Sequence, residues 1–220
     1  MTDTIQPQTR PTLRQSTGPA HTRILAYGAA RGEVAVPNED LVEAIDSSDE
    51  WIRQRTGIIT RTRAVHDTSA IDLAAAAGAE AIATAGIDPQ LIDLVIVATV
   101  SNPKQTPSVS AIVADRVGAN PAAAYDVNAA CAGYAYAVAQ ADALIRGGAA
   151  HYALVIGAEK LSDVVDPTDR TISFLLGDGA GAVVIGPSDF PGIAAAVWGS
   201  DGSKADAVGM DGTLTDFRDG

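Results

Sequence analysis

The sequence predicts an α/β fold, in which helices pack closely on a sheet. Hydrophobic residues make up 47% of the 220 residues but aromatic residues only 5%, so small and branched aliphatic side chains dominate. Such side chains suit helices that pack against strands. The run Leu94–Val97 is apolar at every position, which is typical of a strand buried on both faces. Segments with helical spacing alternate with such runs along most of the chain.

The order of the elements follows from apolar periodicity and from capping residues. Residues 1–22 are polar and predict a flexible N-terminal extension, so the fold is expected to begin at Arg23. Asn38 is expected to cap a short helix, and Ser47 with Glu50 to form the capping box of a second. We expect helices at about 38–45, 47–56, 68–85, 107–117 and 132–145, and strands at 24–27, 58–65, 91–99, 123–127, 152–157, 179–186 and 193–198.

Charge and composition exclude several classes of function. The formal net charge of −12 argues against a nucleic-acid partner, because phosphate binding depends on clustered Lys and Arg. No apolar run approaches the length of about 20 residues that a membrane helix requires, so we expect no membrane partner. A single cysteine excludes an intramolecular disulfide framework and is typical of a reducing compartment. We therefore expect a cytoplasmic protein.

Cys131 lies where the expected strand 123–127 gives way to the helix 132–145. A thiol at the N-terminus of a helix faces unpaired backbone N–H groups, whose partial positive charge favours the thiolate. The residue type alone favours another interpretation, in which Cys131 is a small buried hydrophobe among alanines. Taken by itself, this stretch leaves both interpretations open.

The chain offers Cys131 no obvious general base. Its three histidines are His21 in the N-terminal segment, His66 in a polar loop and His151 ahead of a buried strand. A nucleophilic thiol normally works with a base or a polarising group. If Cys131 is catalytic, we expect its partners to lie outside these 220 residues.

Trp51 and Arg55 are four positions apart on one expected helix and so share a face. An indole beside a guanidinium suits a nucleotide, through stacking and a charge-assisted phosphate contact. A core tryptophan beside a solvated arginine is the alternative. The stretch 177–181 is rich in glycine, but it lacks the Lys-Ser/Thr ending of a phosphate loop and leads into a strand.

Four motifs together give the chain a resemblance to a known family. They are residues 47–58 (SSDEWIRQRTGI), 126–134 (DVNAACAGY), 166–170 (DPTDR) and 177–182 (GDGAGA). In this order the motifs resemble the N-terminal half of β-ketoacyl-acyl-carrier-protein synthase III, and the likeness runs from about residue 23 to 203. The resemblance implies a thiolase-like α/β fold: a mixed five-stranded sheet with helices on its faces, the first half of a duplicated αβαβα architecture.

The family's chemistry implies that Cys131 is the nucleophile. Cys131 would attack an acyl-CoA primer, release CoA and hold the acyl group as a thioester. Its backbone N–H would help to hold the oxyanion. Malonyl-acyl carrier protein would then lose CO₂ and condense with the acyl group, which starts fatty-acid elongation. No cofactor is implied, since the CoA thioester is a substrate.

The resemblance also implies roles around the CoA entrance. Trp51 would stack on the adenine, Arg55 and Arg170 would contact it from either side, and Ser47 would lie near the same entrance. Thr106 occupies the position where some family members have a bulky aromatic residue that closes the acyl pocket. The small side chain of Thr106 predicts room for a longer or branched primer.

One departure concerns the residues that complete the family's site. The His and Asn that bind the malonyl thioester come from the second half of the duplicated fold, and neither motif is present here. We therefore expect an N-terminal thiolase-like domain at 23–220, with the second half supplied by a longer chain or a companion fragment. The resemblance implies a homodimer. Two alternatives remain: an acyltransferase of a specialised-metabolite pathway, and an inactive truncated or partner subunit.

Overall fold

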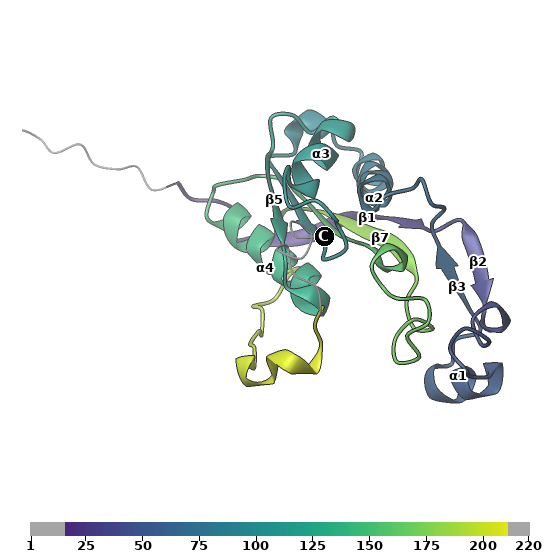
Figure 1. The fold of residues 1–220 in the computed structure, drawn as a ribbon. Coiled ribbons are helices and arrows are strands. Elements are labelled where there is room, and N and C mark those ends of the chain that lie inside the picture. Colours follow the sequence, from purple (N-terminus) through teal and green to yellow (C-terminus); the bar gives the residue numbers. More distant parts are fainter. Residues whose placement is uncertain (1–15, 211–220) are drawn as a thin grey trace, which may run out of the picture.

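The computed structural model describes residues 16–210, and its centre is a five-stranded sheet. The strands follow the spatial order β1-β7-β6-β4-β5. Figure 1 labels β1, β7 and β5 of this sheet. Their bounds are β1 His21–Arg31, β4 Leu94–Ala98, β5 Ala123–Val127, β6 Ala153–Lys160 and β7 Asp178–Ser188. β4 runs parallel to both β5 and β6, whereas β7 is antiparallel to β6 and to β1. The mixed five-stranded sheet predicted from the sequence is confirmed.

Helices cover the two faces of this sheet unequally. α2 (Ala70–Ala85) and α3 (Val109–Arg116) pack on one face, and α4 (Gly133–Arg146) packs on the other. The alternation of β4 side chains explains the arrangement: Val95 and Val97 join the core under α2 and α3, while Leu94 and Ile96 join the core under α4. All four are buried, as the apolar run predicts for a strand covered on both faces.

A smaller unit projects from one end of the sheet (Figure 1). β2 (Val34–Pro37) and β3 (Thr60–Arg63) form an antiparallel ribbon, and the short helix α1 (Asp49–Thr56) lies between them in the sequence. A separate apolar cluster holds this unit together; its buried members are Leu41, Ile45, Ile52 and Phe174. The unit thus has a small core of its own, to which the loop after β6 contributes Phe174.

Local sequence signals set the ends of the two helices on the α2 face. Ser69 caps α2 in a capping box with Asp72, and Gly86 ends the helix with a positive φ of 65°. Ser108 caps α3 by accepting a hydrogen bond from the backbone N–H of Ala111. The predicted bounds of both helices are confirmed within two residues.

Three expected local structures are wrong. Asn38 does not cap a helix at 38–45: it begins a 3-10 turn, Asn38–Asp40, because its amide is engaged by other parts of the chain. Ser48, not Ser47, caps α1 by accepting a hydrogen bond from the Trp51 backbone. Residues 193–198 form no strand, because only the Ile193 end reaches the edge of β1.

The boundary of the N-terminal segment is only partly described. Residues 1–15 of the expected flexible extension lie outside the described residues. β1 begins at His21, two positions before the expected start at Arg23. Ahead of it, the Gly18 backbone donates a hydrogen bond to the Arg146 carbonyl at the end of α4. Among residues 16–210, no helix has the length and apolar character needed to cross a membrane.

Gly28 allows α2 to pack directly on β1, which gives a test of this interface. A Cβ at Gly28 would lie 2.3 Å from the Ala77 carbonyl oxygen and 2.5 Å from the Ala81 nitrogen. Backbone atoms cannot move aside cheaply, so we predict that Gly28→Ala lowers the free energy of unfolding by about 3 kcal/mol.

Urea denaturation measures this effect, and Gly181→Ala is the matched control. Gly181 lies on the adjacent strand, but a Cβ there would meet nothing within 4 Å. The control is expected to change the free energy of unfolding by less than about 1 kcal/mol. Equal losses in the two variants would contradict the close packing of α2 on β1.

Candidate active site

Three loops that carry predicted site residues leave the same edge of the sheet. Since β4, β5 and β6 run parallel, their carboxyl ends lie together. Thr106 follows β4, Cys131 follows β5 and Arg170 follows β6. Open α/β sheets bind their ligands outside the carboxyl ends of parallel strands. The topology therefore brings three separate motifs to the edge where a ligand site is expected.

Cys131 lies at the predicted strand-to-helix junction. A 3-10 turn, Ala130–Ala132, connects β5 to Gly133 at the start of α4. Ala130 has a φ of 43°, a left-handed conformation that costs a non-glycine residue about 1–3 kcal/mol. The thiol is free and exposed, which disagrees with the interpretation of Cys131 as a buried packing residue. No side chain caps α4, and the backbone N–H of Gly133, its first residue, donates to the Ala130 carbonyl within the turn.

The three histidines lie on three different segments, and none of them is hydrogen-bonded to Cys131 within residues 16–210. His151 precedes β6, at the opposite end of the sheet from the carboxyl edge. His21 begins β1, and His66 lies in the β3–α2 loop, where its carbonyl accepts a hydrogen bond from Lys160. No hydrogen bond reaches the thiol from any residue in the range 16–210. A base for Cys131 outside these residues stays a prediction.

Trp51 on α1 forms the centre of a second group of residues. The guanidinium carbon of Arg55 lies 5.2 Å from the centroid of the indole, and that of Arg170 lies 5.9 Å from it. Phe174 packs edge-on against the indole at a centroid distance of 5.4 Å. Arg170 also lies 3.6 Å from Asp46, an exposed pair that adds little stability. Trp51 is thus half-buried, with Phe174 at its edge and two cations near its ring.

A buried asparagine holds the helix that carries the indole. Asn38 is fully buried, and its Nδ2 donates to Asp49 Oδ1 at 2.7 Å and to the Ile58 carbonyl at 2.8 Å. Its Oδ1 accepts a hydrogen bond from Arg61 at 2.5 Å. Hydrogen bonds from Arg53 and then Asn38 lower the pKa of the Asp49 carboxyl. Asn38 therefore ties the first turn of α1 to β3.

Ser47 and Thr106, the remaining predicted site residues, have different surroundings. The Ser47 hydroxyl is buried and finds no hydrogen-bond partner within residues 16–210. Thr106 is exposed in the loop between β4 and α3. Across the described part of the chain, no hydrogen bond or ion pair joins the Trp51 group to Cys131. The Trp51 group belongs to the ribbon unit and Cys131 to the main sheet, so a ligand that touches both has to bridge the two.

The sequence interpretation missed three residues that shape this edge. Asp126 and Glu159 accept hydrogen bonds from the backbone on either side of the loop that carries Thr106. Phe174 supports the indole. Asp126 falls inside the motif around Cys131, and its carboxylate directly follows a run of apolar strand residues. This pattern could have identified Asp126 from the sequence. No comparable pattern marks Glu159 or Phe174.

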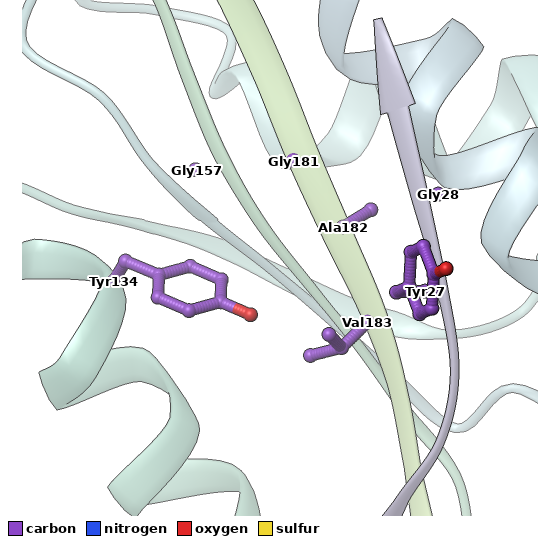
Figure 2. Close-up of a pocket in the computed structure, with 7 residues that line it drawn as sticks. All are labelled: Tyr27, Gly28, Tyr134, Gly157, Gly181, Ala182 and Val183. Atoms are coloured by element: carbon purple, nitrogen blue, oxygen red, sulfur yellow. The ribbon is translucent and has the colours of Figure 1, made fainter.

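An apolar hollow of about 380 Å³ lies beside α4 on its face of the sheet (Figure 2). Gly157 and Gly181 leave this space because they carry no side chain toward it. Tyr134 and Tyr27 border it from α4 and β1, and the Tyr134 ring points across the hollow toward Val183. Tyr27 is 74% exposed, so a large apolar ring lacks cover within the described residues.

Comparison with protein families gives a match to part of the chain. The family described as 3-oxoacyl-[acyl-carrier-protein] synthase III matches residues 125–202. This range includes the end of β5, the Cys131 turn, α4, β6 and β7. The matched range thus covers two of the three loops at the carboxyl edge.

Curated proteins match more of the chain. A β-ketoacyl-[acyl-carrier-protein] synthase III of Kocuria rhizophila is 58% identical over 207 residues, which cover 94% of this chain and 58% of that protein. One from Streptomyces glaucescens is 47% identical over 208 residues, covering 94% and 62%. The chain therefore spans about three-fifths of the length of these relatives.

Solved structures show the same similarity. The priming β-ketosynthase of the R1128 polyketide pathway has a TM-score of 0.91 and 39% identity, covering 96% of this chain and 63% of that one. The β-ketoacyl-[acyl-carrier-protein] synthase III of Thermus thermophilus has a TM-score of 0.80 and 40% identity, covering 84% and 57%. The thiolase-like fold expected from the sequence is confirmed.

The Asn38 network gives a test of how α1 is held. Asn38→Ala removes the partner of Asp49, of the Ile58 carbonyl and of Arg61 in a buried setting. Because buried groups without partners are costly, we predict a loss of about 2–4 kcal/mol in the free energy of unfolding, measured by urea denaturation.

The matched control lies on α1 itself. Gln54→Ala breaks the exposed hydrogen bond between Gln54 and Glu50, and should cost less than about 0.5 kcal/mol. If Asn38→Ala were as mild as this control, α1 would not depend on the buried amide.

Proposed function

Because the chain belongs to the β-ketoacyl-[acyl-carrier-protein] synthase III family, we propose that Cys131 takes an acyl group from an acyl-CoA primer. The observation that carries the proposal is the exposed thiol at a strained turn on the carboxyl edge of the sheet. The sulfur attacks the thioester carbonyl, a new C–S bond forms and CoA leaves as the thiol. The product is an acyl-cysteine, which divides the condensation into two easier steps.

Backbone groups at the same turn stabilise the charge that develops. The carbonyl oxygen of the thioester becomes an oxyanion as the sulfur attacks. The N–H of Cys131 lies in the Ala130–Ala132 turn, and α4, whose N-terminus no side chain caps, follows it. Fixed N–H donors at the site of developing charge are among the strongest contributions to catalysis.

The Trp51 group binds the nucleotide of CoA in this proposal. The indole offers an aromatic face to the adenine, while Arg55 and Arg170 supply positive charge for its phosphates. Ser47 lies just ahead of α1, and we place its buried hydroxyl, which has no hydrogen-bond partner within residues 16–210, near this entrance. A thioester bound in this way bridges the ribbon unit and the Cys131 turn on the main sheet.

The second step of the proposed reaction condenses the acyl group with malonyl-acyl carrier protein and releases CO₂, which starts fatty-acid elongation. We propose that the His and Asn for this step come from a second segment, since these relatives are longer than this chain. The apolar hollow beside α4 and the exposed Tyr27 ring offer that segment a surface to cover. No cofactor takes part in the proposed reaction.

We also propose a homodimer in the cytoplasm. β5 is an edge strand whose outer N–H and C=O groups have no partner strand in the described chain. Such an edge pairs readily with a second copy of itself. The free Cys131 thiol suits a reducing compartment.

A specialised-metabolite pathway is the second candidate setting. The high structural similarity to a priming ketosynthase of polyketide synthesis favours it. In that case Cys131 would still accept the acyl group, but the acceptor would differ. An acceptor assay with malonyl-acyl carrier protein, compared with other carriers, separates the two settings.

We predict that Cys131 becomes acylated when the protein is incubated with acetyl-CoA or with octanoyl-CoA. Intact mass measures the gain of one acyl group, and peptide mapping locates it. Cys131→Ser is the control and should gain no thioester. Acylation by both substrates is expected because Thr106 is small; a strict acetyl preference would contradict the open acyl pocket. A thiol inert to both would favour a structural subunit.

We predict that Trp51→Ala raises the acyl-CoA concentration needed for half-maximal acylation by about tenfold, since stacking of a base on an aromatic ring contributes about 1–3 kcal/mol. An acyl-pantetheine substrate lacks the nucleotide, so its kinetics should not change. Trp198→Ala is the matched control, because Trp198 packs on Tyr136 instead. A similar effect of Trp51→Ala on both substrates would rule out a nucleotide contact.

A further inference from the structure

The loop between β4 and α3, residues 99–108, is held at both ends by carboxylates from the two neighbouring strands. Glu159 lies on β6 and Asp126 on β5, which flank β4 on its two sides. We propose that Asp126 and Glu159 are positioning residues that fix this loop against Cys131 and thereby set which acyl chain lengths the thiol accepts. The inference rests on the proposed acyl transfer to Cys131.

Glu159 binds the beginning of the loop. Its Oε1 accepts a hydrogen bond from the Val100 backbone at 2.9 Å, and its Oε2 accepts one from the Ser101 backbone at 3.0 Å. The hydroxyl groups of Ser101 and Thr99 donate to the same Oε2. The Ser101 hydroxyl in turn accepts a hydrogen bond from the Lys160 backbone at 2.8 Å. The first residues after β4 are therefore joined to the end of β6.

Asp126 binds the other end of the loop. Its Oδ2 accepts a hydrogen bond from the Val109 backbone at 2.7 Å, and its Oδ1 accepts one from the Ser110 backbone at 2.8 Å. Both donors belong to the first turn of α3, where backbone N–H groups lack helical partners. A carboxylate at this position also interacts favourably with the helix dipole. The end of the loop is therefore joined to β5.

Neither carboxylate serves as an ion-pair partner. No salt bridge within residues 16–210 involves Asp126 or Glu159, and every hydrogen bond they accept there comes from the segment 99–110. An ionised carboxylate only accepts hydrogen bonds, so it suits a cluster of N–H and O–H donors. Their common role is therefore to hold this one segment.

The same strand connects the loop to the nucleophile. Asp126 lies in β5 just ahead of the Cys131 turn, and the Val127 carbonyl accepts a hydrogen bond from Thr99 at the start of the loop. A Cβ at Gly133, the first residue of α4, would lie 3.1 Å from the Ala98 side chain. The chain after β4 thus packs directly beside the chain that carries the thiol. A shift of residues 99–101 would therefore alter the packing next to the Cys131 turn.

The test compares acylation rates of the protein by octanoyl-CoA and by acetyl-CoA. Asp126→Asn keeps the shape of the side chain but replaces one acceptor oxygen with an NH₂ donor facing a backbone N–H. We expect the octanoyl-to-acetyl rate ratio to change by about tenfold, because small displacements near a reacting group have large effects on rate. Glu159→Gln should change the ratio in the same sense. Asp126→Glu retains both acceptors and should lie closer to the wild type.

Asp93→Asn is the matched control. The Asp93 carboxylate also accepts hydrogen bonds from two backbone N–H groups, those of His151 and Tyr152, but at the opposite end of the sheet. Asp93→Asn should lower the temperature of thermal unfolding, because a backbone contact is lost. The octanoyl-to-acetyl rate ratio should stay at the wild-type value. An unchanged ratio in both Asp126→Asn and Glu159→Gln would overturn the proposal, as would an equal change in Asp93→Asn.

A second measurement keeps the inference separate from the proposed function. N-methylmaleimide and N-octylmaleimide alkylate a thiol without CoA, and the ratio of their rates at Cys131 reports access for a long chain. If the wild type reacts with maleimides but not with acyl-CoA, the proposed function fails and the maleimide ratio still decides the role of the carboxylates. Faster hydrogen exchange at the Val109 and Ser110 amides in Asp126→Asn is expected; exchange at the wild-type rate would contradict the proposal.

Discussion

The parallel alignment of β4, β5 and β6 is the constraint on which the candidate site depends. Parallel strands end at the same edge, so the loops that follow them meet there although they are far apart in sequence. Thr106, Cys131 and Arg170 each follow one of these strands. The central strand β4 is buried along its whole length, so the helices on both faces hold it in place while β5 and β6 pair with it.

The two groups of site residues are held by different means. The Cys131 turn belongs to the main sheet, and its position follows from β5 and from the close contact of Gly133 with Ala98. The indole of Trp51 belongs to the smaller ribbon unit, and the buried amide of Asn38 holds its helix. The buried amide and the small apolar cluster of its own unit together fix the proposed nucleotide platform, whereas the packing of the main sheet fixes the nucleophile. Substitutions in the ribbon unit are expected to change the binding of acyl-CoA more than the rate of acyl transfer to Cys131.

Elements with local signals could be predicted from the sequence. The helix α2 is an example, because Ser69, Asp72 and Gly86 define its ends within the segment itself. Residues 193–198 have the composition of a strand, but a strand also needs a neighbouring edge, and beyond Ile193 the segment finds none in the described chain. The residue type of Asn38 favours a helix cap. Its actual hydrogen-bond partners include Asp49 of α1 and Arg61 of β3, so no signal within the segment itself reveals them. The junction at Cys131 was predictable, whereas the carboxylate of Glu159 was not, because its partners lie more than fifty positions away.

One elongated thioester that spans the Trp51 group and Cys131 is the central claim. The most direct measurement is a crystal structure of the Cys131→Ala protein, with any segment that co-purifies, bound to an acyl-CoA. We expect the adenine to lie on the Trp51 ring between Arg55 and Arg170, and the thioester carbonyl to lie at position 131. A nucleotide bound away from Trp51, or a thioester distant from position 131, would contradict the claim.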